Sequence, residues 1–129
     1  MDLILVIEDS PVNMALTTAI LENAGHSILQ AETAAQGIEV ARRLQPDLIL
    51  MDVQLPDIDG LAATRILKAD PHTRDVPVIA LTAMAMKGDE DEARHAGCDG
   101  YVSKPIRYKE LLAEMDRVLS KAAPRSAGR

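Results

Sequence analysis

The chain has 129 residues, enough for one domain of ordinary size and too few for a second substantial core. It is 47% hydrophobic and 26% charged, which excludes a largely disordered chain. With 2 Tyr, no Phe and no Trp, it lacks the stacking platforms of single-stranded nucleic-acid modules, and its net charge of −6 disfavours a general binder of phosphate backbones.

The chain has a single cysteine, which excludes an intrachain disulfide. Its apolar runs are all far shorter than a membrane span. The acids Asp2 and Glu8, on either side of the first apolar run, are wrong for a secretory signal peptide. We therefore expect a cytoplasmic protein without a membrane partner.

Five short apolar runs alternate with segments of helical length. The runs cover residues 3–7, 27–31, 48–51, 76–81 and 100–102. The first, third and fourth are continuously apolar, as in strands that are buried on both faces. The helical segments lie between Pro11 and Gly25, between Thr33 and Pro46, and at residues 60–69, 87–96 and 108–121. This alternation predicts a parallel sheet with helices on both faces.

The first two helical segments begin with recognisable start signals. Ser10 is placed to cap the first, and Pro11 suits the first helical position. Thr33 and Gln36 have the spacing of a capping box at the start of the second. Apolar residues then form a stripe along the first helix: Val12, Leu16, Ala19 and Ile20.

Polar side chains follow the carboxyl ends of the predicted strands, the edge at which open α/β sheets bind ligands. They are Glu8, Asp9, Asp52, Thr82 and Lys104. Each alone has an ordinary explanation as a helix cap, a strand end or a loop cation. Three crowded carboxylates, however, repel one another unless a cation binds, and ligands that are all oxygen suit Mg²⁺ better than zinc. The lysine and threonine add donors for phosphate oxygens, a combination typical of phosphoryl transfer.

These residues resemble the receiver domain of two-component response regulators. The resemblance covers about residues 3–120 and rests on Glu8-Asp9, the stretch from Leu48 to Pro56 with Gly60, Ala80-Leu-Thr82-Ala83, and Gly100-Tyr101-Val-Ser-Lys104-Pro105. It implies a flavodoxin-like, doubly wound α/β fold with five helices and a five-stranded parallel sheet of order 2-1-3-4-5, as in the family's chemotaxis regulator. We expect the receiver domain to span residues 1–122 and residues 123–129 to form a flexible C-terminal tail.

The resemblance implies a role for each site residue. Asp52 accepts a phosphoryl group, and Mg²⁺ is held by Glu8, Asp9, Asp52 and the Gln54 backbone carbonyl. The phosphoryl oxygens are contacted by Lys104 and Thr82. The switch is formed by Thr82 and Tyr101, and the peptide bond before Pro105 is cis. Asp57 and Asp59 are rival acceptors on paper. Both follow Pro56 in the loop before Gly60, where a loop-tip or helix-cap carboxylate is the usual role, so we assign the phosphoryl group to Asp52.

Taken together, these features favour a single-domain response regulator and not an enzyme: a phosphoacceptor that catalyses its own phosphorylation and dephosphorylation. The chain starts at the first strand and ends after the fifth helix, so we expect no fused effector. The partners implied are a sensor histidine kinase or histidine phosphotransfer protein, and a downstream protein at the surface of the fourth helix, fifth strand and fifth helix, without direct DNA binding.

Three alternatives stay open at this point. The first is a receiver cut from a hybrid kinase, the second is an autonomous Mg²⁺-dependent phosphohydrolase, and the third is a degenerate receiver kept as a scaffold. The hydrolase usually needs a second acid two residues after the nucleophile, where this sequence has Gln54. The complete set of five site residues disfavours the scaffold.

Overall fold

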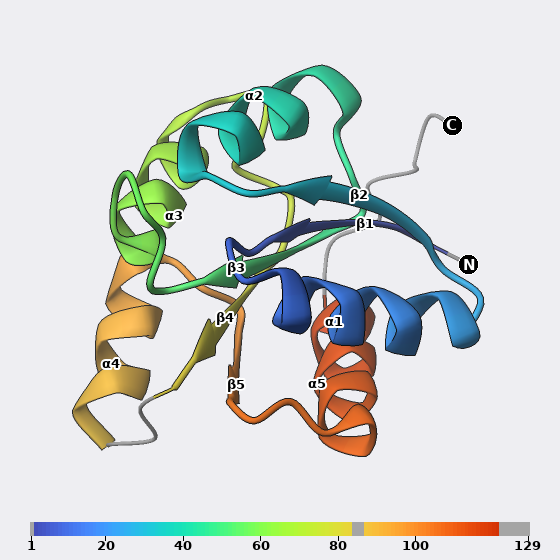
Figure 1. The fold of residues 1–129 in the computed structure, drawn as a ribbon. Helices are drawn as coiled ribbons and strands as arrows, with labels where there is room; N and C mark the ends of the chain where they lie inside the picture. Colours follow the sequence, from blue (N-terminus) through green and yellow to red (C-terminus); the bar gives the residue numbers. More distant parts are fainter. Residues whose placement is uncertain (1, 84–86, 122–129) are drawn as a thin grey trace.

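The computed structural model describes residues 2–83 and 87–121, and within these ranges five parallel strands alternate with five helices (Figure 1). The strands are β1 (Leu3–Ile7), β2 (Ser27–Ala31), β3 (Leu48–Asp52), β4 (Val78–Thr82) and β5 (Gly100–Ser103). The helices are α1 (Pro11–Asn23), α2 (Ala34–Leu44), α3 (Gly60–Ala69), α4 (Lys87–Ala96) and α5 (Tyr108–Lys121). The sheet order β2-β1-β3-β4-β5 confirms the predicted fold, while residues 123–129, the predicted tail, lie outside the described residues.

The helices cover both faces of the sheet. α1 and α5 lie on one face, and α2, α3 and α4 lie on the other (Figure 1). Every residue of β3 and β4 is buried, which explains why these strands read as continuous apolar runs. The core is aliphatic, as a chain without Phe or Trp requires. Within the described ranges, none of the helices has the length and apolar character needed to cross a membrane.

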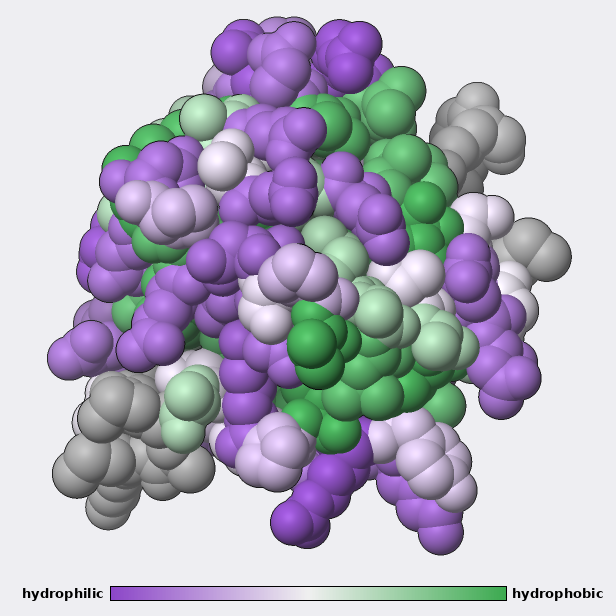
Figure 2. Space-filling model, viewed as in Figure 1, coloured by the Kyte–Doolittle hydropathy of each residue, from purple (hydrophilic) through white to green (hydrophobic). Residues whose placement is uncertain are grey.

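α1 turns most of its predicted apolar stripe away from the core, and of that stripe Ile20 packs partly against the core. The Ser10 hydroxyl accepts a hydrogen bond from the Asn13 amide, so the predicted cap is present. Val12, however, is 76% exposed and Leu16 is 43% exposed, and the side chains that α1 buries are instead Met14, Thr17 and Leu21. The spacing of apolar residues identified one apolar face of this helix, but the opposite face is apolar too and is the one that is buried. Figure 2 shows the resulting apolar patch over α1 and the start of α5.

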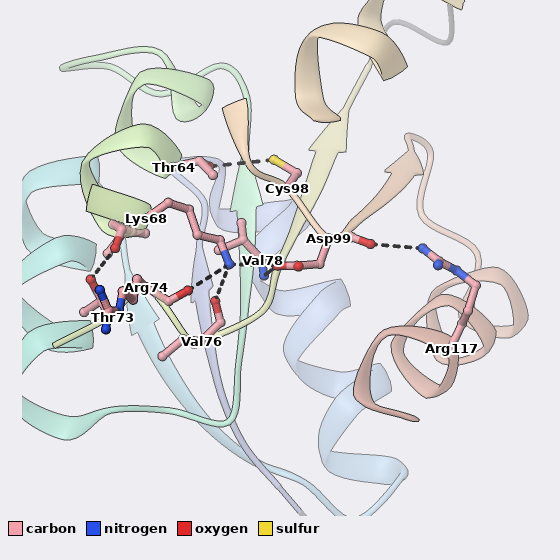
Figure 3. Close-up of polar contacts among 10 residues, drawn as sticks. Thr64, Lys68, Thr73, Arg74, Val76, Val78, Cys98, Asp99 and Arg117 are labelled. Carbon is pink, nitrogen blue, oxygen red and sulfur yellow. Dashed lines mark hydrogen bonds and ion pairs between the residues drawn. The ribbon is translucent and has the colours of Figure 1, made fainter. Parts of the chain in front are cut away.

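Lys68, at the end of α3, ties together the amino-terminal ends of β4 and β5 (Figure 3). Its ammonium lies 2.9 Å from Asp99 Oδ2 and donates to the backbone carbonyls of Arg74 and Val76. Asp99 Oδ2 also accepts the Val78 amide, the first of β4. A lysine therefore braces this end of the sheet, at the edge remote from the carboxyl ends of the strands.

Candidate functional site

Three carboxylates meet at the carboxyl edge of the sheet. Asp52 is the last residue of β3, and Glu8 directly follows β1, where its amide donates to the Ala31 carbonyl at the end of β2. Glu8 and Asp52 are buried, whereas Asp9 is exposed. One oxygen of each acid lies within 4.8 Å of one oxygen of the others. The predicted acid cluster is therefore present, with an outer member open to solvent.

Lys104 enters this cluster from the loop after β5. Its Nζ lies 3.0 Å from Glu8 Oε1 and 3.2 Å from Asp52 Oδ2. Its backbone amide donates to the Thr82 carbonyl at 2.6 Å, which joins the loop to the end of β4. The peptide bond between Lys104 and Pro105 is cis. Lys104 thus makes polar contacts with the carboxyl ends of three other strands, β1, β3 and β4.

The charges of this cluster are unbalanced. Burial, together with the hydrogen bond and the negative charge of Asp52, raises the pKa of the Glu8 carboxyl. Burial opposes the charge of the Lys104 ammonium, but the hydrogen bond to Glu8 and the charge of Asp52 outweigh it and raise the pKa of that lysine. A single ammonium faces three carboxylates, so the site fits a hard divalent cation with oxygen ligands, such as Mg²⁺.

The residues after Asp52 shape the metal side of the site. The Gln54 amide donates to Asp52 Oδ1 at 3.1 Å, and the Gly60 amide donates to the Val53 carbonyl at 2.8 Å. A Cβ on Gly60 would collide with the Asp52 carbonyl, so the start of α3 packs against the end of β3 only because this residue is glycine. Gln54, whose carbonyl is the predicted fourth ligand, therefore sits in a tightly closed turn.

Thr82 and Tyr101 lie on neighbouring strands. Thr82 ends β4 and is buried, and Tyr101 is half-buried on β5, where Ala80 is its register partner. The two side chains line one pocket of about 90 Å³, together with Val53, Gln54, Asp59, Leu61 and Glu92. The two residues predicted to form the switch thus share a cavity next to the acid cluster.

The rival acids, Asp57 and Asp59, lie outside the cluster. The described residues that form it are Glu8, Asp9 and Asp52. Asp59 caps α3 by accepting the Leu61 amide at 2.7 Å. Asp57 accepts backbone amides of α2, and both contacts hold the pKa of its carboxyl below the usual range. Both acids therefore have structural partners of their own.

One wall of the site was not predicted from the sequence. A hollow of about 450 Å³ opens beside Glu8 and Asp9, between α1 and the end of β2. The other residues that line it are Pro11, Met14, Ala15, Gln30, Glu32 and Gln36. Gln30 and Glu32 lie at the carboxyl end of β2, so the rule that located the other site residues applied to them as well.

The comparisons with known proteins agree with this geometry. A family model described as the response regulator receiver domain matches residues 4–116. The polar-differentiation response regulator DivK of Brucella ovis is 40% identical over 119 residues, which cover 92% of this chain and 97% of that protein.

Solved structures resemble the whole fold. The receiver domain of sensor histidine kinase PA1611 from Pseudomonas aeruginosa, with a magnesium ion coordinated in its active site cleft, is 38% identical with a TM-score of 0.85, covering 92% of this chain and 98% of that one. Chemotaxis protein CheY4 of Vibrio cholerae has a TM-score of 0.86 at 23% identity, covering 92% of this chain and 98% of that one, which shows the fold alone.

Proposed function

The chain belongs to the family of response regulator receiver domains, and we propose that it signals by accepting a phosphoryl group on the Asp52 carboxylate. The observation that carries this proposal is the place of Asp52: it is buried at a strand end, within the acid cluster and 3.2 Å from the Lys104 ammonium. An Asp52 oxygen forms a bond to the phosphorus of a phosphohistidine, the nitrogen–phosphorus bond breaks, and the imidazole leaves.

The neighbouring residues hold the charges of this transfer in place. Glu8, Asp9, Asp52 and the Gln54 carbonyl would hold Mg²⁺, which neutralises charge on the phosphoryl oxygens when bound. Lys104 donates to the phosphoryl oxygens, since its ammonium already lies against Asp52. Water later attacks the phosphorus, the bond between phosphorus and the Asp52 oxygen breaks, and inorganic phosphate leaves the free carboxylate. This chain therefore takes part in both its phosphorylation and its dephosphorylation. Gln54 has no proton-transferring carboxyl, which disfavours a phosphohydrolase acting on external substrates.

The switch proposal rests on the pocket shared by Thr82 and Tyr101. The Thr82 hydroxyl contacts the phosphoryl group when Asp52 carries it, and Tyr101 moves into the space beside Thr82. β5 passes this change to α5, because the Glu114 carboxylate accepts the Tyr101 amide at 2.9 Å and pairs with Arg117. The output partner is accordingly a protein that binds the surface of α4, β5 and α5.

The donor protein binds on the α1 side. α1 starts two residues after Asp9, and its exposed stripe leads away from the acid cluster into an apolar groove of about 650 Å³ between α1 and α5. A sensor kinase or histidine phosphotransfer protein that reaches Asp52 there covers Val12 and Leu16. Leu16→Ser should therefore slow transfer from the protein donor and leave phosphorylation by acetyl phosphate unchanged.

The experiment that tests the acceptor is intact-mass measurement after incubation with acetyl phosphate and Mg²⁺. The wild type should gain one phosphoryl group, and Asp52→Asn, which keeps the shape and loses the nucleophile, should gain none. Asp57→Asn and Asp59→Asn are the matched controls and should still reach one phosphoryl group after long incubation. Labelling of Asp52→Asn at the wild-type level would overturn the assignment.

A further inference from the structure

The loop from Val53 to Asp59 is fastened at both of its ends. The bond from the Gly60 amide to the Val53 carbonyl closes its base, and the Asp59 carboxylate anchors its far end to the start of α3. Between these two points lie Gln54, the proposed carbonyl ligand, and Asp57. Asp57 makes a third attachment, which reaches α2, outside the β3–α3 segment.

Asp57 binds the amino terminus of α2. Its Oδ1 accepts the Ala34 amide at 2.9 Å, and its Oδ2 accepts the Ala35 amide at 2.9 Å, across 23 and 22 residues of sequence. These amides are the first two of the helix and have no partner within it. Thr33 accepts the Gln36 amide instead, so the two acceptors divide the free amides of α2 between them.

α2 in turn packs against β1, the strand that Glu8 directly follows. A Cβ on Gly37 would collide with the Ile7 side chain, so α2 packs closely on β1 at this glycine. Ile7 directly precedes Glu8, and the Glu8 amide is bonded to Ala31, just before α2 begins. Asp57 therefore connects the Gln54 loop to a rigid part of the fold that also holds Glu8.

We propose that Asp57 is a positioning residue of the metal site: by holding its loop against the start of α2, it fixes the Gln54 carbonyl relative to Glu8 and Asp52. This inference rests on the proposed function, because it assumes that the cluster binds Mg²⁺. Asp57 is not itself a ligand, since both of its oxygens accept α2 amides and it lies outside the described acid cluster. Partners that orient metal ligands commonly contribute ten- to a hundredfold to metal affinity.

The test is the Mg²⁺ dissociation constant, measured by isothermal titration calorimetry on unphosphorylated protein. Asp57→Ala should weaken Mg²⁺ binding about tenfold. Thr33→Ala is the matched control: it also removes an acceptor from the start of α2, but it leaves the loop attached, so its Mg²⁺ affinity should stay at the wild-type value. Both variants should lower the melting temperature, because both leave amides of α2 unsatisfied.

Asp57→Asn provides a second variant if the alanine protein does not fold. Its amide side chain keeps one oxygen that can accept an α2 amide, so its Mg²⁺ affinity should lie between wild type and Asp57→Ala. The inference is overturned if the Asp57 variants bind Mg²⁺ as the wild type does while melting as low as Thr33→Ala, because Asp57 is then a helix cap only. A wild type that binds no Mg²⁺ would instead overturn the proposed metal site itself.

Discussion

Two lysines contact carboxylates at opposite ends of the same sheet, and the number of carboxylates around each ammonium differs. Lys68 lies at the amino-terminal ends of β4 and β5, where its ammonium contacts Asp99 and the carbonyls of Arg74 and Val76 (Figure 3). An ammonium has three donors, and these three acceptors use all of them. One acid faces one base, so this cluster is neutral and the donors of its ammonium are all used.

Lys104 lies at the carboxyl ends of the strands, where it contacts Glu8 and Asp52 while Asp9 completes the cluster. Three carboxylates here face one ammonium, and two of them are buried. The same type of ion pair thus serves two purposes. The balanced cluster at Lys68 braces the fold, whereas the unbalanced cluster at Lys104 leaves negative charge that a bound cation can neutralise.

The largest difference between the two lysines should appear in phosphorylation. Lys104→Met should slow phosphorylation of Asp52 by acetyl phosphate about 100-fold or more, because it removes a charged donor from the reacting oxygens. Lys68→Met is the matched control, since it removes the same charge at the other end of the sheet, and its rate should stay near that of the wild type. Rates come from intact mass against time. Equal slowing in both variants would mean that the lower rate comes from a less stable fold and not from the loss of a donor to the reacting oxygens.

The contribution of Lys68 to stability should not depend on Mg²⁺. Lys68→Met should lower the free energy of unfolding by about 1 kcal/mol, because Asp99 and two carbonyls lose a charged donor at a partly exposed site. The loss should be the same with and without Mg²⁺, since no metal ligand is involved. Urea unfolding followed by circular dichroism measures it, with Lys109→Met as a control for removing an exposed lysine. A loss that Mg²⁺ reverses would contradict the division between the two clusters.

Removing an acid should have effects of opposite sign at the two ends. Without Mg²⁺, Asp9→Asn should raise the free energy of unfolding by about 1 kcal/mol, because it relieves repulsion from two carboxylates a few ångströms away. Asp99→Asn should lower it, because Lys68 loses its counter-ion. Thermal melts in EDTA compare the two variants. If Asp9→Asn were destabilised, the negative charge of the three acids would already be neutralised without a metal ion, which contradicts the account.

The fold was largely predictable because local signals and the global pattern agree. The continuous apolar runs predicted the buried strands, and Pro11 and Gly60 predicted helix starts that the structure shows at the same residues. The parallel arrangement then brings the carboxyl ends of the strands to one edge. For that reason, the strand-end acids Glu8 and Asp52 were found in sequence before any distance was known.

The remaining features depend on contacts that no local pattern encodes. The stripe of α1 containing Val12 was visible, but spacing alone did not show that Met14 and Leu21 on the other face would be buried in its place. Asp57 looked like a loop-tip or helix-cap carboxylate, and its attachment to Ala34 spans 23 residues. Such a bond follows from how α2 and α3 pack, which the sequence of the loop does not contain.

The excess of negative charge around Lys104 should make a cation site, and a thermal melt with and without Mg²⁺ tests this most directly. A ligand that binds only the folded state adds RT ln(1 + [L]/Kd) to stability. Because the chain has no Trp, differential scanning calorimetry is the practical readout. We predict that saturating Mg²⁺ raises the melting temperature of the wild type and leaves that of Asp9→Ala unchanged. An unchanged wild-type melting temperature, or an equal rise in both proteins, would contradict the claim.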